Sequence, residues 1–274
     1  AEQLVRANGW IEVSTVCAAL FGVMLGGLLV AERLQGWSFY ADLNLWLGSG
    51  GRFNASLAAV LLLYGLAAWL NRMIPDSGVR YPSHAWHVMA VWQRFKQDHL
   101  KLWRDPLGSI SLSVTTLFWG VSGNLRYIVL AWSAAALGYS TTQASSLVGV
   151  VAIGTAVGAV VASMRMRLEH ATRIMPLGIL MGIALLVMVF ISDLWLAVPF
   201  LIFIGGLGGF LVVPMNALLQ HRGHNLMGAG RSIAVQNLNE QLCILLLGGL
   251  YTLFTGMGLT AFGAITAFGA LVAF

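Results

Sequence analysis

The sequence predicts an all-α, polytopic membrane protein built as a bundle of transmembrane helices. Of its 274 residues, 58% are hydrophobic and 9% are charged, and the mean hydropathy is +0.82. A soluble domain carries roughly 25% charged residues, so this composition excludes an ordinary water-soluble protein. The apolar residues also gather in runs of about 20, the length at which a helix crosses a bilayer. The 32 glycines are typical of helices that pack closely in lipid.

Eight apolar segments are predicted to span the membrane, two before a long polar stretch and six after it. In order they are 9–31, 55–74, 107–137, 144–164, 174–191, 194–219, 232–254 and 259–274. Several exceed the roughly 20 residues that a span requires, so we expect tilted helices or shorter membrane-embedded parts.

The basic residues predict which ends of the segments face the cytoplasm. Cytoplasmic gaps are enriched in Lys and Arg, and twelve of the 15 such residues fall in alternate gaps. Of the other three, Arg33 and Arg52 lie in the opposite gaps and Arg126 lies inside a segment. Membrane topology therefore accounts for the net charge of +5, and we expect no nucleic-acid partner.

The long polar stretch divides the chain into three predicted parts: 1–75 with two helices, a cytoplasmic loop at 76–106, and 107–274 with six helices. Because two and six are unequal, and the chain starts at Ala1 rather than Met, we interpret it as an N-terminally truncated fragment of a protein with two six-helix halves. The last helix is also expected to be cut short. Within the loop, residues 84–105 are predicted to form an amphipathic helix on the cytoplasmic leaflet, with a solvated linker helix as the alternative.

Ionisable residues inside the predicted spans are the candidate site residues, because charges in lipid are costly and often functional. Arg126 lies near the middle of 107–137. Thr115, Trp119, Ser122 and Arg126 are three or four residues apart and so share one helix face. This face is predicted to line a cavity in which the Arg126 guanidinium binds a phosphate or a carboxylate. A structural ion pair with a carboxylate on a neighbouring helix is the alternative.

Glu240 is a second candidate, within an otherwise apolar helix. Gln236, Asn239 and Glu240 share one face, which is predicted to line a polar path and to contact the substrate or a coupling ion. Hydrogen bonding between helices is the alternative. Glu12 repeats the pattern, because Asn8 precedes it by four residues as Gln236 precedes Glu240. A glutamate near a helix N-terminus is also stabilised by the helix dipole, which leaves both readings of Glu12 open.

The segment 194–219 contains four glycines and Pro214, which predicts a bent or closely packed helix. Asn216 follows that proline, and we expect it to take part in binding. Small residues four apart predict helix contacts at three glycine pairs: Gly22 and Gly26, Gly154 and Gly158, and Gly205 and Gly209.

Motifs of membrane enzymes and of metal or phosphate sites are absent from the sequence. It has no His-x4-Asp acyltransferase box, no His-Glu-x-x-His, no Cys-x-x-Cys and no Gly-x-x-x-x-Gly-Lys loop. The two cysteines, Cys17 and Cys243, both lie within apolar runs, so neither a disulfide framework nor a zinc site is predicted. We expect no cofactor and no enzymatic activity.

Several stretches resemble the bacterial lysophospholipid transporter family of the major facilitator superfamily, and they extend in order over most of the chain. They are Leu-Val-Arg-Ala-Asn-Gly-Trp-Ile-Glu-Val-Ser-Thr at 4–15, Leu-Phe-Trp-Gly at 117–120 with Leu-Arg-Tyr at 125–127, Phe-Leu-Val-Val-Pro-Met-Asn-Ala-Leu-Leu-Gln-His-Arg-Gly at 210–223, and Gly-Ala-Gly-Arg-Ser-Ile-Ala-Val-Gln-Asn-Leu-Asn-Glu at 228–240.

The resemblance implies a twelve-helix fold, of which this chain would hold helices five to twelve. It implies that lysophospholipids such as lysophosphatidylethanolamine move from the outer to the inner leaflet of the bacterial inner membrane for re-acylation, by alternating access. It also implies that Arg126 acts at the lipid headgroup with a carboxylate of the first helix, outside this chain. An acyltransferase and acyl-carrier-protein synthetase, fused or associated, is the implied partner.

Two other functions fit the same residues. A proton-coupled exporter of small amphipathic solutes would need a carboxylate in the membrane that takes up and releases a proton. From another class come a membrane-embedded lipid enzyme, which the missing nucleophile and metal motifs disfavour, and a non-transporting anchor of a fused acyltransferase. The anchor would leave lipid movement unchanged when Arg126 is replaced.

Overall fold

The computed structural model describes residues 2–30, 34, 36–48, 53–76, 78 and 87–273. They fall into two compact units, Ala1–Cys17 with His87–Phe274 and Ala18–Trp86. The division into two membrane halves and a loop, inferred from the sequence, stays a prediction. Some positions used in the sequence argument lie outside the described residues: Arg33, Arg52 and the first three residues of the predicted 84–105 helix.

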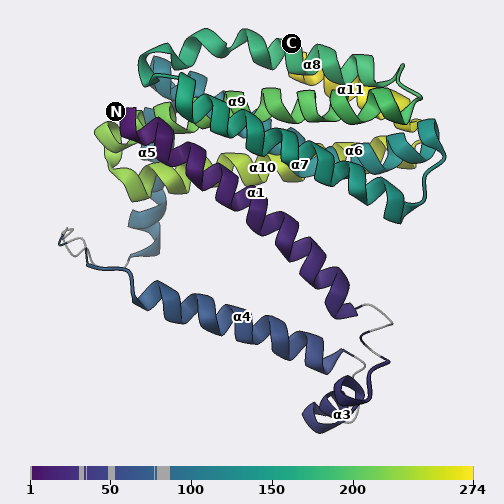
Figure 1. The fold of residues 1–274 in the computed structure, drawn as a ribbon. Helices are drawn as coiled ribbons and strands as arrows, with labels where there is room; N and C mark the ends of the chain where they lie inside the picture. Colours follow the sequence, from purple (N-terminus) through teal and green to yellow (C-terminus); the bar gives the residue numbers. More distant parts are fainter. Residues whose placement is uncertain are drawn as a thin grey trace. The chain divides into compact units, whose positions relative to one another are not determined.

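All the regular structure in the described residues is helical (Figure 1). The larger unit holds the first half of α1 (Glu2–Val30), followed by α5 (Val88–Arg104), α6 (Pro106–Leu137), α7 (Thr141–Arg165), the 3-10 helix η1 (Leu168–Ile174), α8 (Pro176–Met188), α9 (Leu194–Met227), α10 (Ala229–Gly256) and α11 (Ala261–Ala273). The smaller unit holds the rest of α1, α3 (Ser38–Leu47) and α4 (Asn54–Arg72).

Five of the described helical segments are long and apolar enough to cross a membrane. They are Asn54–Arg72, Gln143–Arg165, Leu168–Met188, Leu194–Met227 and Ala229–Gly256. Each overlaps a span predicted from the sequence, and the chain is therefore a polytopic α-helical membrane protein. The 32 residues of α6 would also suffice in length, but α6 is not among these five, and it carries several hydroxyl side chains together with Asn124 and Arg126.

In the smaller unit, hydroxyl groups join α3, α4 and the end of α1. The hydroxyls of Tyr40 and Ser56 lie 2.7 Å apart, and that of Ser56 also donates to the backbone oxygen of Leu29 at 2.7 Å. These bonds satisfy polar groups that lipid could not satisfy. At Gly22 and Gly26, one of the predicted contact pairs, an added Cβ atom would meet no atom of another described helix within 4 Å, so the structure shows no helix contact there.

In the larger unit, α7 and α9 lie side by side, backbone against backbone (Figure 1). A Cβ atom on Gly158 would overlap the backbone oxygen of Gly206, and one on Gly205 would overlap that of Val151. Only glycine permits so close an approach. The other two predicted contact pairs are thus confirmed: Gly154 with Gly158 on α7, and Gly205 with Gly209 on α9.

The helix α9 runs unbroken through Pro199 and Pro214. Most of its residues from Ile204 to Leu219 are buried, because α6, α7, α8 and α10 all pack against it. This central helix therefore carries its polar side chains, Asn216 and Gln220, into the interior of the larger unit.

The amphipathic helix predicted in the loop is present as α5, which begins at Val88 in the described chain. Its second half packs into the bundle, since Leu102 is fully buried in a cluster with Leu112, Leu219 and neighbouring apolar residues. Its first half is exposed and includes Trp92. Part of the apolar face is therefore occupied by the bundle itself, and contact of the remainder with the leaflet stays a prediction.

Candidate functional site

Two amide side chains on α9 connect it to α1 and to α10. Asn216 and Gln220 are four residues apart and so project from one face of α9. Gln220 and Asn8 of α1 bond reciprocally, with Asn8 Nδ2 donating to Gln220 Oε1 at 2.9 Å and Gln220 Nε2 donating to Asn8 Oδ1 at 3.0 Å. Gln236 Nε2 of α10 donates to Asn216 Oδ1 at 3.0 Å.

Both amides on the outer helices lie four residues before a buried glutamate. Gln236 Nε2 also donates to Glu240 Oε1 at 2.7 Å. Glu12 and Glu240 are both buried, with 6% and 8% of the residue surface exposed. At both places in the repeated spacing noted in the sequence, the amide is bonded to α9 and the glutamate one turn later is buried. We call the six residues the amide–carboxyl cluster: Asn8, Glu12, Asn216, Gln220, Gln236 and Glu240.

Asn239, expected on the same face as Gln236 and Glu240, makes different contacts. Its Nδ2 donates to the backbone oxygen of Val235 at 2.7 Å and lies 3.5 Å from Nδ1 of His99 on α5. The structure thus places Asn239 against α5, whereas Gln236 turns towards α9. One helical face is wide enough to contact two neighbouring helices. The spacing of the residues alone could not tell which of the two helices Asn239 and Gln236 would each contact.

Arg126 is exposed on α6, and no described carboxylate lies within ion-pair distance of it. Its guanidinium carbon lies 5.2 Å from the centre of the Tyr127 ring, a cation–π contact. The ion pair considered as the alternative for Arg126 is therefore absent from the described part of the chain. An arginine without a carboxylate keeps its planar set of donors available for an anionic ligand.

The other residues of the predicted Arg126 face differ in exposure. Thr115 is fully buried, and its hydroxyl donates to the backbone oxygen of Leu112 at 3.2 Å. Trp119 and Ser122 are half-buried. Thr115 therefore does not line an open surface together with Arg126 in this conformation. Packing buries the beginning of this helix face, at Thr115, and leaves its end, at Arg126, exposed.

Arg126 and the amide–carboxyl cluster lie at different heights in the bundle. Gly120 packs against Cys243, and Asn124 Nδ2 donates to the backbone oxygen of Ile244 at 3.1 Å, which fixes the register of α6 against α10. In that register Arg126 lies about eight residues beyond the level of Glu240, or roughly 12 Å along the helix axis. The sequence had suggested no such separation.

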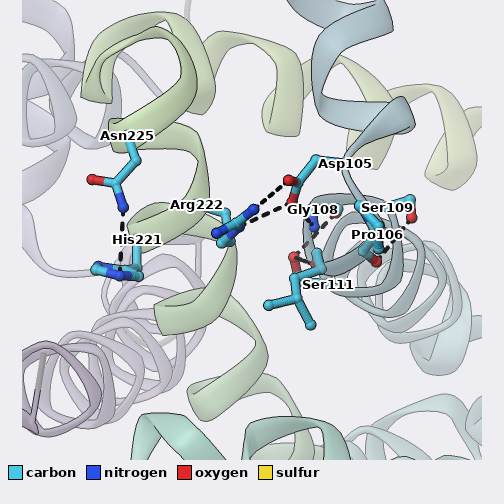
Figure 2. A network of polar contacts seen from close by, with 9 residues as sticks. Asp105, Pro106, Gly108, Ser109, Ser111, His221, Arg222 and Asn225 are labelled. Atoms are coloured by element: carbon cyan, nitrogen blue, oxygen red, sulfur yellow. Dashed lines mark hydrogen bonds and ion pairs between the residues drawn. The ribbon is translucent and has the colours of Figure 1, made fainter.

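An ion pair that sequence reasoning missed ties the start of α6 to α9 (Figure 2). Asp105 caps α6 by accepting from Gly108 N at 2.8 Å, and it also accepts from Arg222 Nε at 3.0 Å and from Arg222 Nη2. The hydrogen bond from Arg222 is the largest of the effects that hold the pKa of Asp105 below its usual value. Nearby, Arg231 of α10 pairs with the buried Asp98 of α5 at 3.3 Å.

A mostly apolar cavity of about 470 Å³ lies between α6, α8 and α9, lined among others by Leu117, Phe118, Pro176 and Leu211. It is distinct from the surface around Arg126. Nine residues separate Leu117 from Arg126, and at 3.6 residues per turn this places them on opposite sides of α6.

The fold and these buried polar groups define the class: a polytopic α-helical membrane protein with a polar cluster inside one helical unit. No family model and no solved structure matches the chain. Curated relatives named "Lysophospholipid transporter LplT" do match it. That of Serratia proteamaculans (strain 568) is 40% identical over 92% of this chain and 59% of its own length.

The corresponding protein of Pectobacterium carotovorum is 37% identical over 94% of this chain and 59% of its own length. That of Escherichia coli O6:K15:H31 is 38% identical over 94% of this chain and 60% of its own length. The chain is thus similar to lysophospholipid transporters over more than nine tenths of its own length, as the resemblance in its sequence indicated, and it spans about three fifths of the length of these relatives.

Proposed function

We propose that the protein transports lysophospholipids, such as lysophosphatidylethanolamine, from the outer to the inner leaflet of the bacterial inner membrane. The observation that carries the proposal is the 40% identity, over 92% of the chain, to a relative named as a lysophospholipid transporter. The apolar helices and the buried polar groups fit that activity, since polar residues within a membrane bundle commonly mark a substrate path.

In the proposed mechanism, Arg126 binds the lipid phosphate while two halves of a major facilitator fold rock about a central cavity. A guanidinium offers paired donors to a phosphate, and no described carboxylate competes for Arg126. The ends of α6, α9 and α10 nearest α5 face the cytoplasm in this proposal, because the basic residues gather there. The product would then be re-acylated by an acyltransferase and acyl-carrier-protein synthetase.

The test is uptake of labelled lysophosphatidylethanolamine by spheroplasts that express the transporter or its variants at matched levels. Arg126→Ala should abolish uptake, and Arg126→Lys should restore part of it, because an ammonium keeps the charge but lacks the paired donors. Arg173→Ala, which removes an exposed arginine next to the end of η1, is the matched control and should transport normally. Normal uptake by the Arg126→Ala variant would contradict the proposed role.

The burial of Glu12 and Glu240 favours a second candidate, a proton-coupled exporter of small amphipathic solutes. This candidate predicts that a pH gradient drives solute movement and that lysolipid is not moved. If the protein is instead a non-transporting anchor for an acyltransferase, lipid uptake should be the same for the unaltered protein and for Arg126→Ala.

A further inference from the structure

The exposed first half of α5 continues the helix face that packs into the bundle. The residues of this face are three or four positions apart and therefore line one side of the helix; they are Val88, Val91, Phe95, Asp98 and Leu102. Leu102 and Asp98 are buried against the larger unit, whereas Val88 and Val91 are 86% and 55% exposed. The apolar side of the first half therefore points the same way as the buried side of the second half.

The helix α5 runs across one end of the bundle (Figure 1). Its partners lie at helix ends, because Arg231 is in the first turn of α10 and Leu112 is in the second turn of α6. In a bundle that spans a membrane, the helix ends lie at the membrane surface, so a helix that crosses them lies along that surface. The side of α5 that faces the bundle is then directed towards lipid wherever the bundle does not cover it.

Aromatic rings extend along α5 next to this face. Trp92, Phe95, His99 and Trp103 follow one another with ring centroids 6.2 or 6.3 Å apart. Trp92 and Trp103 are 60% and 40% exposed. Tryptophan is enriched where a membrane meets water, because its ring is apolar and its N–H is polar. Exposed tryptophans beside the exposed Val88 are thus typical of a helix that lies in the headgroup region.

The exposed charges of α5 are all positive. They are carried by Arg94, Lys96, Lys101 and Arg104. The one acidic residue of this helix, Asp98, is 2% exposed and pairs with Arg231 of α10 at 3.3 Å. A surface of acidic phospholipids complements both the positive charge and the apolar face. An acidic protein in solution would complement the charge alone, because the apolar side of the helix is directed towards the membrane.

We propose that the exposed half of α5 binds the lipid surface through acidic phospholipid headgroups. Arg94 and Lys96 pair with the headgroup phosphates, while Val88 and Trp92 insert among the lipids. The other half of the helix stays fixed to the bundle through Leu102 and the ion pair with α10. This inference goes beyond the proposed function, since the bound phospholipids belong to the membrane and are not the transported molecules.

Quenching by brominated lipid measures whether this side of α5 touches the membrane. The transporter, with Cys17→Ser and Cys243→Ala, receives one new cysteine by Val88→Cys or by Gln97→Cys, is labelled with bimane, and is placed in phosphatidylglycerol vesicles. Gln97 provides the matched control, because it is exposed and lies nine residues from Val88, on the opposite side of the helix. We expect bromolipid to quench the label at position 88 and to leave that at position 97 almost unchanged.

The role of the acidic headgroups is tested by removing charge from either partner. In vesicles of phosphatidylcholine, which has no net charge, quenching at position 88 should fall. In phosphatidylglycerol vesicles, Lys96→Gln should lower the ratio of bound to unbound helix about fivefold, the contribution of one basic residue near an acidic surface. Arg173→Gln is the matched control, because it removes an exposed charge on η1 and should leave the quenching unchanged.

Two results would overturn the proposal. Quenching at position 97 that equals or exceeds that at position 88, or none at either, would show that α5 is solvated or covered by protein. Equal quenching in both kinds of vesicle, unchanged by Lys96→Gln, would exclude recognition of acidic headgroups. The measurement needs no turnover, so a protein that moves no lysophospholipid can still give the expected quenching. Failure of the proposed function and failure of this inference are therefore distinguishable.

Discussion

The ion pair between Asp105 and Arg222 should stabilise the fold measurably, and a double-mutant cycle can isolate its contribution. Their side chains are 10% and 32% exposed, so the pair is only partly screened by water. A hydrogen bond to a charged group is worth about 1.5–3 kcal/mol, and the partial exposure of Arg222 places this pair near the lower end, at about 1.5 kcal/mol. Asp105→Asn retains an oxygen to cap α6, and thus removes mainly the charge.

The assay measures the free energy of unfolding in mixed micelles, with unfolding monitored by circular dichroism. It compares the unaltered protein with Asp105→Asn, Arg222→Gln and the double variant. The exposed pair between Arg167 and Glu169, with its atoms 3.9 Å apart, provides the control cycle and should give a few tenths of a kcal/mol at most. A coupling energy for Asp105 and Arg222 that is as small as the control value would refute the reasoning.

The same pair predicts a pH dependence. The pKa of Asp105 is lowered in the folded state, so its contribution to stability is fully present above the unfolded pKa and is lost as the pH falls through the folded pKa. The difference in stability between the unaltered protein and Asp105→Asn should therefore be constant near neutral pH and shrink below about pH 4. A difference that stays constant into that acidic range would show that the charge of Asp105 does not stabilise the fold.

Three further substitutions test the packing of the larger unit by the same unfolding assay. Gly158→Ala should destabilise the α7–α9 contact by about 1–3 kcal/mol, whereas Gly249→Ala, where no atom lies within 4 Å, should not destabilise it. Leu102→Ala should cost about 2–5 kcal/mol, because it leaves a cavity where α5 packs into the bundle. Trp132→Phe should cost about 1–3 kcal/mol, because it removes the donor to the backbone oxygen of Met188 at 3.0 Å and leaves that oxygen unpaired.

The helices were predictable because a run of about 20 apolar residues has few stable alternatives to a spanning helix. The α7–α9 contact was predictable for a related reason, since glycines four apart on two helices allow backbone to approach backbone. The attachment of Asn8 and Gln236 to one face of α9 had only one sequence signal, the glutamate four residues after each amide. That signal indicated that the two helices are similar, but only the bonds to α9 show that both attach to the same helix.

The burial of a side chain, and the residue that it contacts, could not be predicted from the sequence of one helix alone. Thr115 shares a face with Arg126, yet packing at the start of α6 buries the threonine and leaves the arginine exposed. Asn239 shares a face with Glu240, yet it contacts His99 of α5. The partner of Asp105 could not be foreseen either, because Arg222 is 117 residues away in the sequence.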